Sequence, residues 1–269
     1  MRGYFYKRLK FRTAKFGVKY YLDFSPKADY YLFDDRGLPM VRYGAELIDF
    51  PVTVINFYLG KLDDGKFEPK DLVKISEYVD KHTVDGEFLF CHDFEEKNWK
   101  NEPIWFSNLP HAMLFSLLVR VGLNYDIGEY FNRELAYFYN SLFKAEIFDK
   151  ENWIFLEYPS IQSQPLNGQL FGLFAVYDAY QNDMEIEQNY LRAVNASLQL
   201  LKDQITFFGW TKYNEYRLAS PFYHFLHISQ LKVCEKLDSR FLTYRLRAQI
   251  AVIFYPFVVV YKIIKIYFK

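Results

Sequence analysis

Apolar residues at helical spacing are the feature of this sequence that most restricts its fold. Leu72, Ile75 and Val79 recur at intervals of three and four residues, and the segment that holds them ends on Gly86. The same spacing predicts further helices over residues 109–122, 130–143, 166–181, 185–205, 221–231 and 239–254. Helices joined by short loops pair as antiparallel hairpins, which either stack side by side or curve into a toroid.

The two ends of the chain differ from this helical middle. Strand-like stretches concentrate near the N-terminus, at 18–24 (VKYYLDF) and 30–35 (YYLFDD). No Gly- or Ser-rich linker separates the ends from the middle. We therefore expect a β-rich extension over 1–45, one helical domain over 46–247 and a C-terminal tail over 248–269.

Composition argues against several classes of protein. Hydrophobic residues make up 51% of the 269, which is enough to fill a substantial core. Lys plus Arg and Asp plus Glu both total 33, so no field of one sign draws the chain to nucleic acid. Cys91 and Cys234 lie in no CxxC pattern, and the first residues lack the apolar run of a signal peptide, so we predict a cytoplasmic location. The motifs of phosphate loops, dinucleotide folds, zincins and serine hydrolases are missing.

The C-terminal tail is apolar and flanked by cations. Residues 248–261 carry no charge and include Pro256, and they fall short of the roughly 20 residues that a membrane-spanning helix needs. Two interpretations stay open: a last core helix, or an interfacial membrane segment whose cations meet anionic headgroups. The flanking cations are Arg245, Arg247, Lys262, Lys265 and Lys269.

Two histidines share one face of the predicted helix at 221–231. His224 and His227 are three residues apart, and Tyr223 precedes the first. Their face can hold a metal ion, a polar ligand or only the protein core. No acidic third ligand stands beside them in the sequence, so the polar ligand is the favoured interpretation.

Other segments also gather polar and aromatic residues where a loop meets a helix. A helix does not need such residues, and their recurrence at several junctions is typical of the rim of a ligand-binding site. The residues are Trp105, Asn108 and His111 in one segment, Glu157, Tyr158 and Asn167 in a second, and Trp210, Tyr213, Tyr216 and Arg217 in a third.

At these junctions the sequence resembles a known family. The stretches EYPSIQSQPLNGQLFGLFAVYD (157–178) and GWTKYNEYRLASPFYHFLHISQL (209–231) resemble the C-terminal domain of the D-glucuronyl C5-epimerases. That domain has the pattern EYP, LNG and GLYD, followed by a tyrosine and then YHxxHIxQL. More weakly, residues 103–120 look like the family segment PWISAxAQGQAISVLLR, and residues 50–60 like NPxTIAQYGL.

The resemblance implies both a fold and an activity. The fold would be mainly α, an incomplete α/α toroid of antiparallel helix hairpins with a short β-rich N-terminal segment. The activity would be inversion of C5 in uronic acid residues of a polysaccharide, without a cofactor. The acid/base candidates carried over from the family are Glu157, Tyr158, Tyr213 and Tyr223. The residues expected to bind or orient the sugar are Asn167, Arg217, His224, His227, Trp105 and His111.

The chemistry of C5 inversion sets requirements that these residues can meet. A weakly acidic proton alpha to a carboxylate leaves one face of the sugar, and another proton returns from the opposite face, so two proton-transfer groups must flank the ring. Charge then moves onto the carboxylate, which calls for hydrogen-bond donors or a cation already in place. A tyrosine that acts as the base needs its reference pKa of roughly 10 lowered by a neighbour.

The chain also departs from the family in three places. Residues 111–113 (HAM) stand where the family has QGQ, and residues 56–59 (NFYL) stand where it has QYGL. The animal enzymes have an arginine three residues after the tyrosine that Tyr213 matches, whereas here Tyr216 holds that place and Arg217 follows. The contacts to the substrate carboxylate are therefore expected to differ.

We interpret the sequence as a cytoplasmic, metal-independent epimerase acting on a uronic acid polysaccharide of the heparosan type. Two alternatives stay open. A polysaccharide lyase would remove the same proton and then expel the C4 substituent, and a non-catalytic glycan-binding subunit would keep the cleft without turnover. Peripheral membrane contact through residues 248–269 and a homodimer are further expectations.

Overall fold

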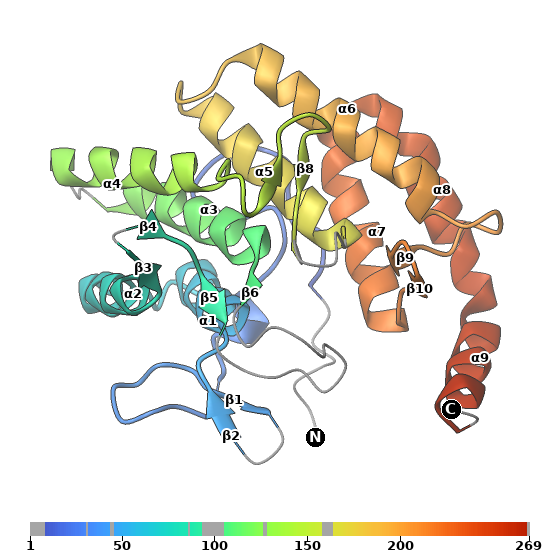
Figure 1. The fold of residues 1–269 in the computed structure, drawn as a ribbon, viewed down its shortest axis with the longest axis horizontal. Helices are drawn as coiled ribbons and strands as arrows, with labels where there is room; N and C mark the ends of the chain where they lie inside the picture. The colour runs from blue at the N-terminus through green and yellow to red at the C-terminus, as the bar shows by residue number, and fades with distance from the viewer. Residues whose placement is uncertain are drawn as a thin grey trace.

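α-Helices carry most of the described chain, as the apolar spacing predicts (Figure 1). The structure is a computed structural model, and it describes residues 9–30, 32–43, 46–85, 87–92, 105–125, 128–157 and 164–267. The helices are α1 (Pro51–Asp63), α2 (Pro69–Lys81), α3 (Asn108–Asn124), α4 (Gly128–Ser141), α5 (Leu166–Gln181), α6 (Glu187–Gln204), α7 (Pro221–Leu237), α8 (Leu242–Ile250) and α9 (Tyr255–Tyr267). The mainly helical class is confirmed, although α1 and α9 were not among the predicted helices.

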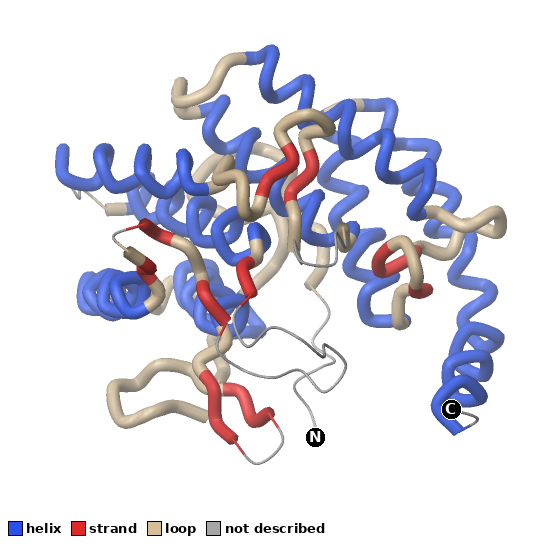
Figure 2. Tube along the Cα trace, in the orientation of Figure 1, coloured by secondary structure: helices blue, strands red, loops and turns tan. Residues whose placement is uncertain are grey.

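Strands in the described residues are short and form only two-stranded antiparallel hairpins (Figure 2). They are β1 (Val41–Tyr43) with β2 (Glu46–Ile48), β3 (Thr83–Val84) with β4 (Glu87–Phe88), β5 (Cys91–His92) with β6 (Trp105–Phe106), β7 (Phe148–Asp149) with β8 (Ile154–Phe155), and β9 (Lys212–Asn214) with β10 (Arg217–Leu218). These hairpins connect helices and build no common sheet.

The strands expected at 18–24 and 30–35 do not form in the described residues. This part of the chain holds isolated bridges and one 3-10 helix, η2 (Ser25–Lys27). Tyr20 and Tyr21 are both fully buried, and their rings pack against Phe171 and Phe174 of α5. Aromatic residues favour strands in general, but here the surface that buries them is helical.

A buried ion pair joins the two central helices. Arg120 of α3 donates to both carboxylate oxygens of Asp178 in α5, at 2.7 and 3.0 Å, and neither side chain is exposed. The Tyr21 hydroxyl also donates to Asp178, and the guanidinium lies 4.7 Å from the centre of the Tyr21 ring. Removing one partner of such a pair costs about 3–5 kcal/mol, so the N-terminal segment and both helices are held as one unit.

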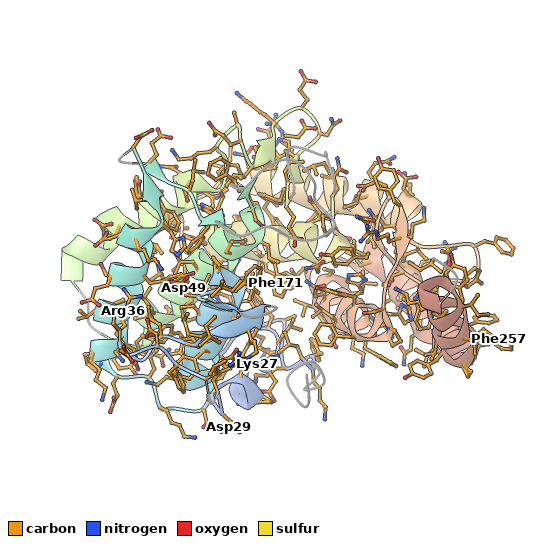
Figure 3. The ribbon with its side chains drawn as sticks, turned by 60° about the horizontal axis from the view of Figure 1, so that its bottom comes forward. Lys27, Asp29, Arg36, Asp49, Phe171 and Phe257 are labelled. Atoms are coloured by element: carbon orange, nitrogen blue, oxygen red, sulfur yellow. The ribbon has the colours of Figure 1, made fainter. Side chains whose placement is uncertain are left out.

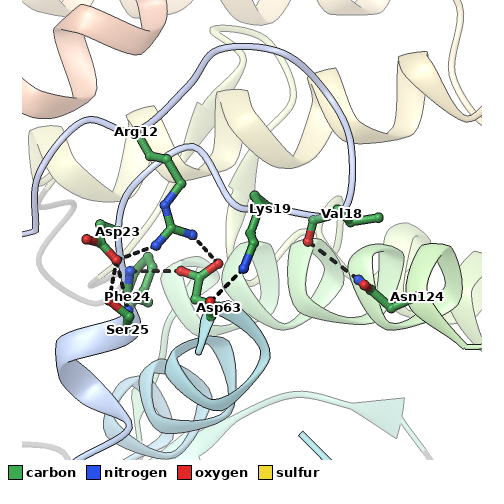
Figure 4. A network of polar contacts seen from close by, with 8 residues as sticks. All are labelled: Arg12, Val18, Lys19, Asp23, Phe24, Ser25, Asp63 and Asn124. Carbon is green, nitrogen blue, oxygen red and sulfur yellow. Dashed lines mark hydrogen bonds and ion pairs between the residues drawn. The ribbon is translucent and has the colours of Figure 1, made fainter. Parts of the chain in front are cut away.

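A polar network fastens the N-terminal segment to α1 (Figure 4). Asp63, the last residue of α1, pairs with Arg12 and accepts a hydrogen bond from the Phe24 backbone N–H at 2.9 Å. Gly60 allows the two backbones to approach, because a Cβ there would lie 2.6 Å from the Ala28 nitrogen. The 3-10 helix η2 consequently lies directly against α1.

The C-terminal residues form a helical column along one edge of the molecule (Figure 1). From α8 the chain passes through the 3-10 helix η5 (Ala251–Phe254) into α9. Val258 is 4% exposed and packs with Trp210, and the Lys262 ammonium donates to the Leu218 carbonyl at 2.8 Å. One face of the expected tail therefore packs against the domain. None of the described helices is both long and apolar enough to cross a membrane.

Candidate functional site

One cavity brings together four of the residues predicted from the sequence. Glu157, Asn167, Tyr213 and Tyr223 all line it. They come from the chain just after β8, the first turn of α5, the strand β9 and the first turn of α7. Sequence separation between them reaches 66 residues, so the helix packing is what makes them neighbours. These four residues are called the motif wall below.

Glu157 reaches the cavity because two glycines of α5 leave room for the chain beside it. A Cβ on Gly172 would lie 2.1 Å from the Phe155 ring, and one on Gly168 would lie 3.3 Å from Glu157 Oε2. Residues four apart on a helix and two apart on a strand share a face, which matches these pairs. The Gln169 side-chain oxygen accepts from the Phe155 N–H at 3.0 Å and fixes the register. Glu157 is left 7% exposed beside the N-terminus of α5, where the helix dipole favours an anion.

Tyr213 and Tyr223 form a pair on the same wall. Their ring centroids are 4.6 Å apart, and their planes are inclined by 56°. Tyr223 is held in the first turn of α7, where Ser220 caps the helix by accepting from the Tyr223 N–H at 3.4 Å and Pro221 sets the first helical position. Both tyrosines are half-buried, which leaves part of each side chain open to the cavity.

Asn167 presents a buried acceptor. Its side chain is 4% exposed, and its Oδ1 has no hydrogen-bond partner among the described residues. Its backbone carbonyl accepts from Gln230 Nε2 at 3.1 Å, which ties α5 to α7. Because buried polar atoms are rarely left unsatisfied, an Oδ1 beside a cavity is suited to a ligand hydroxyl.

His224 and His227 are core residues in this structure and do not line the cavity. Both are fully buried, and the Nδ1 atoms of His224 and His227 lie 3.0 and 2.9 Å from the Thr211 hydroxyl. His224 Nε2 is 3.0 Å from the Ala248 carbonyl, and its ring stacks on Trp210. Burial lowers the pKa of His224 to about 4 and that of His227 to about 3, so both are neutral near pH 7. They fix β9 and α8 against α7.

Two further predicted residues, His111 and Arg217, do not line the cavity. His111 is 1% exposed, its Nδ1 lies 2.8 Å from the Ser107 carbonyl, and burial lowers its pKa to about 4. Arg217 is exposed on β10 and is not among the residues that line the cavity. Tyr158 and the side chain of Trp105 lie outside the described residues. Within the described part of the chain, no group of three or more His, Cys, Asp or Glu side chains could hold a metal ion.

Lys27 and Asn56 line the same cavity from η2 and α1, and we call them the N-terminal wall. Lys27 ends η2 and lies close to Phe171, another lining residue, in Figure 3. Among the described residues that line the cavity, Lys27 is the only lysine or arginine. The buried Oδ1 of Asn56 in α1 has no hydrogen-bond partner among the described residues. Nothing in the sequence marks Lys27, which stands 130 residues before Glu157, whereas Asn56 falls in a segment with weak family likeness.

The comparison with known families agrees with the geometry of the motif wall. A family model described as the D-glucuronyl C5-epimerase C-terminus matches residues 82–249. The matched range contains all four residues of the motif wall and neither residue of the N-terminal wall. No curated protein matches the chain.

Proposed function

Because the chain belongs to the D-glucuronyl C5-epimerase C-terminus family, we propose that it inverts C5 of uronic acid residues within a polysaccharide. The observation that carries the proposal is that Glu157 lines one cavity together with the tyrosine pair. The substrate would be a glycan with residues of the glucuronic or iduronic type, such as a heparosan-like chain. The toroidal curvature of the helix hairpins, which the family resemblance implies, and a cytoplasmic location belong to the same proposal.

The tyrosine pair decides how the proton-transfer groups are shared between the two faces of the sugar. A ring held between two side chains needs van der Waals contact of roughly 3.5 Å on each side, or about 7 Å in all. The centroids of Tyr213 and Tyr223 are 4.6 Å apart, so no sugar ring fits between them. Both tyrosines must serve the same face, so we assign the other face to Glu157, the carboxylate among the described residues that line the cavity.

The proton transfers follow from this division. In one direction, the Glu157 carboxylate accepts the C5 proton, and a tyrosine hydroxyl of the pair donates its proton to the opposite face of C5. In the reverse direction, the tyrosinate accepts the C5 proton and the Glu157 carboxylic acid donates one. The C5–H bond broken on one face is replaced by a C5–H bond on the other, and the proton exchanged with the side chains comes finally from water.

Lys27 supplies the charge that the intermediate requires. When the C5 proton leaves, electron density moves onto the uronate carboxylate, and a cation nearby stabilises that charge more in the transition state than in the ground state. Lys27 lines the cavity, whereas Arg217, the arginine nearest to the family position, does not. The Oδ1 atoms of Asn56 and Asn167 would accept from sugar hydroxyls on either side of the ring.

Solvent-isotope exchange tests this function directly. The protein is incubated with heparosan in heavy water, and the glycan is analysed by mass spectrometry and NMR. Epimerisation places deuterium at C5 and leaves the chain length unchanged. Tyr223→Phe serves as the matched control, because it keeps the ring and removes only the hydroxyl.

Two other results would overturn the proposal. Unsaturated sugar ends, detected by their ultraviolet absorbance, would mean that C5 deprotonation is followed by loss of the C4 substituent, as in a lyase. Binding of uronic acid polymers without any exchange into C5 would mean a glycan-binding subunit that lacks turnover.

A further inference from the structure

The outer face of the C-terminal helical column is a continuous apolar surface. Its side chains recur every three or four residues from α8 through η5 into α9, and their exposed fractions range from 39% to 72%. A row of large apolar side chains with this much exposure is typical of a surface that binds a protein, a membrane or another ligand. We call this row the apolar stripe, and its described members are Leu242, Leu246, Ile250, Ile253, Phe257, Val260 and Ile264.

The opposite face of the same column is fixed to the domain. Val258 packs against Trp210, and Lys262 is bound to the carbonyl of Leu218 in β10. The His224 ring holds the Ala248 carbonyl at the end of α8. Because these contacts fix one side of the column to the domain, the stripe on the other side faces away from it. Phe257 lies at the edge of the molecule in Figure 3.

Charge in this region is strongly biased. Residues 239–269 contain six Lys and Arg and no Asp or Glu. Since each sign totals 33 in the whole chain, the other 238 residues hold 27 basic and 33 acidic side chains. Glu235 and Asp238, just before the segment, pair with Arg245 and Arg240. Arg247 donates to the Thr206 carbonyl and Lys262 to the Leu218 carbonyl.

A basic groove runs beside the stripe, between α6 and α8. Lys202, Arg240 and Arg247 line it together with Thr243 and Gln199. Arg240 is paired with Asp238, whereas Lys202 and Arg247 add cations next to the apolar row. This is the combination by which an interfacial helix binds lipid, since the apolar side chains enter the acyl boundary while the cations meet anionic headgroups.

We propose that this face docks on an anionic lipid surface, with the apolar stripe at the acyl boundary and the groove cations at the headgroups. A second copy of the chain is a poorer occupant, because two copies would bring two acid-free cationic segments together. An anionic surface is complementary to the same charges. The inference does not depend on the proposed enzyme activity, because neither the stripe nor the groove contributes to the cavity.

Vesicle co-sedimentation tests the docking. The full chain is mixed with vesicles of phosphatidylcholine alone or with about one third phosphatidylglycerol. We expect binding to the anionic vesicles only, weakened at least about fivefold when salt rises from 0.1 to 0.5 M. Phe257→Asp should reduce binding about tenfold or more, since it removes the side chain of a phenylalanine that is 72% exposed and adds a negative charge.

A matched control distinguishes the stripe from apolar exposure in general. Val73→Asp on α2 changes a side chain that is 58% exposed, far along the chain from the stripe, and should leave vesicle binding unchanged. Both variants should keep the parent melting temperature. Absence of binding to anionic vesicles, or equal loss in both variants, would overturn the proposal. So would a concentration-dependent dimer, seen by analytical ultracentrifugation, that Phe257→Asp dissociates.

Discussion

The two walls of the cavity differ in where their residues come from and in what they contribute. The motif wall offers proton-transfer groups and stands on helix starts and a hairpin inside the family range. The N-terminal wall offers a cation and an amide from residues before that range. In the proposed function, the reacting groups and the group that stabilises the charge therefore come from separate parts of one chain. A match to the family range alone therefore leaves out part of the cavity, including its lysine.

The largest expected effect comes from removing a reacting group of the motif wall. Tyr223→Phe and Glu157→Gln should each lower turnover by about 100-fold or more, the loss expected for a general acid/base, while glycan binding and the melting temperature stay near those of the parent. Deuterium exchange at C5 measures the turnover. Tyr216→Phe is the control, because that tyrosine is 76% exposed in the turn before β10. Near-normal exchange in both cavity variants would place the chemistry elsewhere.

Next in size is the effect of the N-terminal wall. Lys27→Gln removes the cation but keeps a long polar side chain, and we expect kcat/KM to fall about 10- to 100-fold. Lys27→Arg should restore part of the loss, because it returns the positive charge. Lys15→Gln, an exposed lysine in the same segment, should change nothing. A fall confined to binding, with kcat unchanged, would show that Lys27 holds the substrate without stabilising the intermediate.

The third effect in size is the loss of folding stability on acidification, which acts through the two histidines packed beside the motif wall. Burial lowers the pKa of His224 to about 4 and that of His227 to about 3, below the usual 6.5. The unfolded chain binds protons at these sites where the folded chain does not, so stability is complete above pH 6.5 and falls as the pH drops from there toward 4. At pH 5.5 we expect a loss of about 1 kcal/mol for each histidine.

Melting curves followed by circular dichroism check this pH dependence. Between pH 7.5 and 5.5 the midpoint should fall by about 5 °C. A midpoint that does not change over this interval would mean that the two histidines accept protons in the folded protein, which contradicts their position in the core.

The smallest expected effect concerns the exposed arginine. Arg217→Ala should change turnover by no more than about twofold, because the residue is exposed and does not line the cavity. A loss as large as that of Lys27→Gln would return the carboxylate contact to the position that the family resemblance suggests. The same isotope-exchange assay measures both variants.

The sequence predicted the motif wall better than any other part of the molecule. Apolar spacing located α5 and α7, and the motifs around Glu157 and Tyr223 named side chains that do meet in one cavity. Helical spacing could not tell whether a face points to a cavity or to the core, so His224 and His227 were expected to bind the sugar. Both are in fact buried with their Nδ1 atoms against Thr211, and the His224 ring stacks on Trp210.

The place of Lys27 in the N-terminal wall could not be predicted, because long-range packing alone creates it. The aromatic run around Tyr20 has the composition of a strand, and only the presence of α5 beside it shows why it stays irregular. Lys27 is positioned by Gly60, which allows η2 to lie against α1, and by the ion pair between Asp63 and Arg12. The residues next to Lys27 in the sequence do not predict such long-range contacts.

The hydrogen bond from Tyr21 to Asp178 has a consequence for the order in which the segments of the protein fold after synthesis. The two residues are 157 positions apart, so Tyr21 leaves the ribosome long before its acceptor is synthesised. The guanidinium of Arg120, which lies over the Tyr20 and Tyr21 rings, also follows about 100 residues later. The segment translated first is therefore among the last to reach its native position, and α3 and α5 act as the template on which it settles.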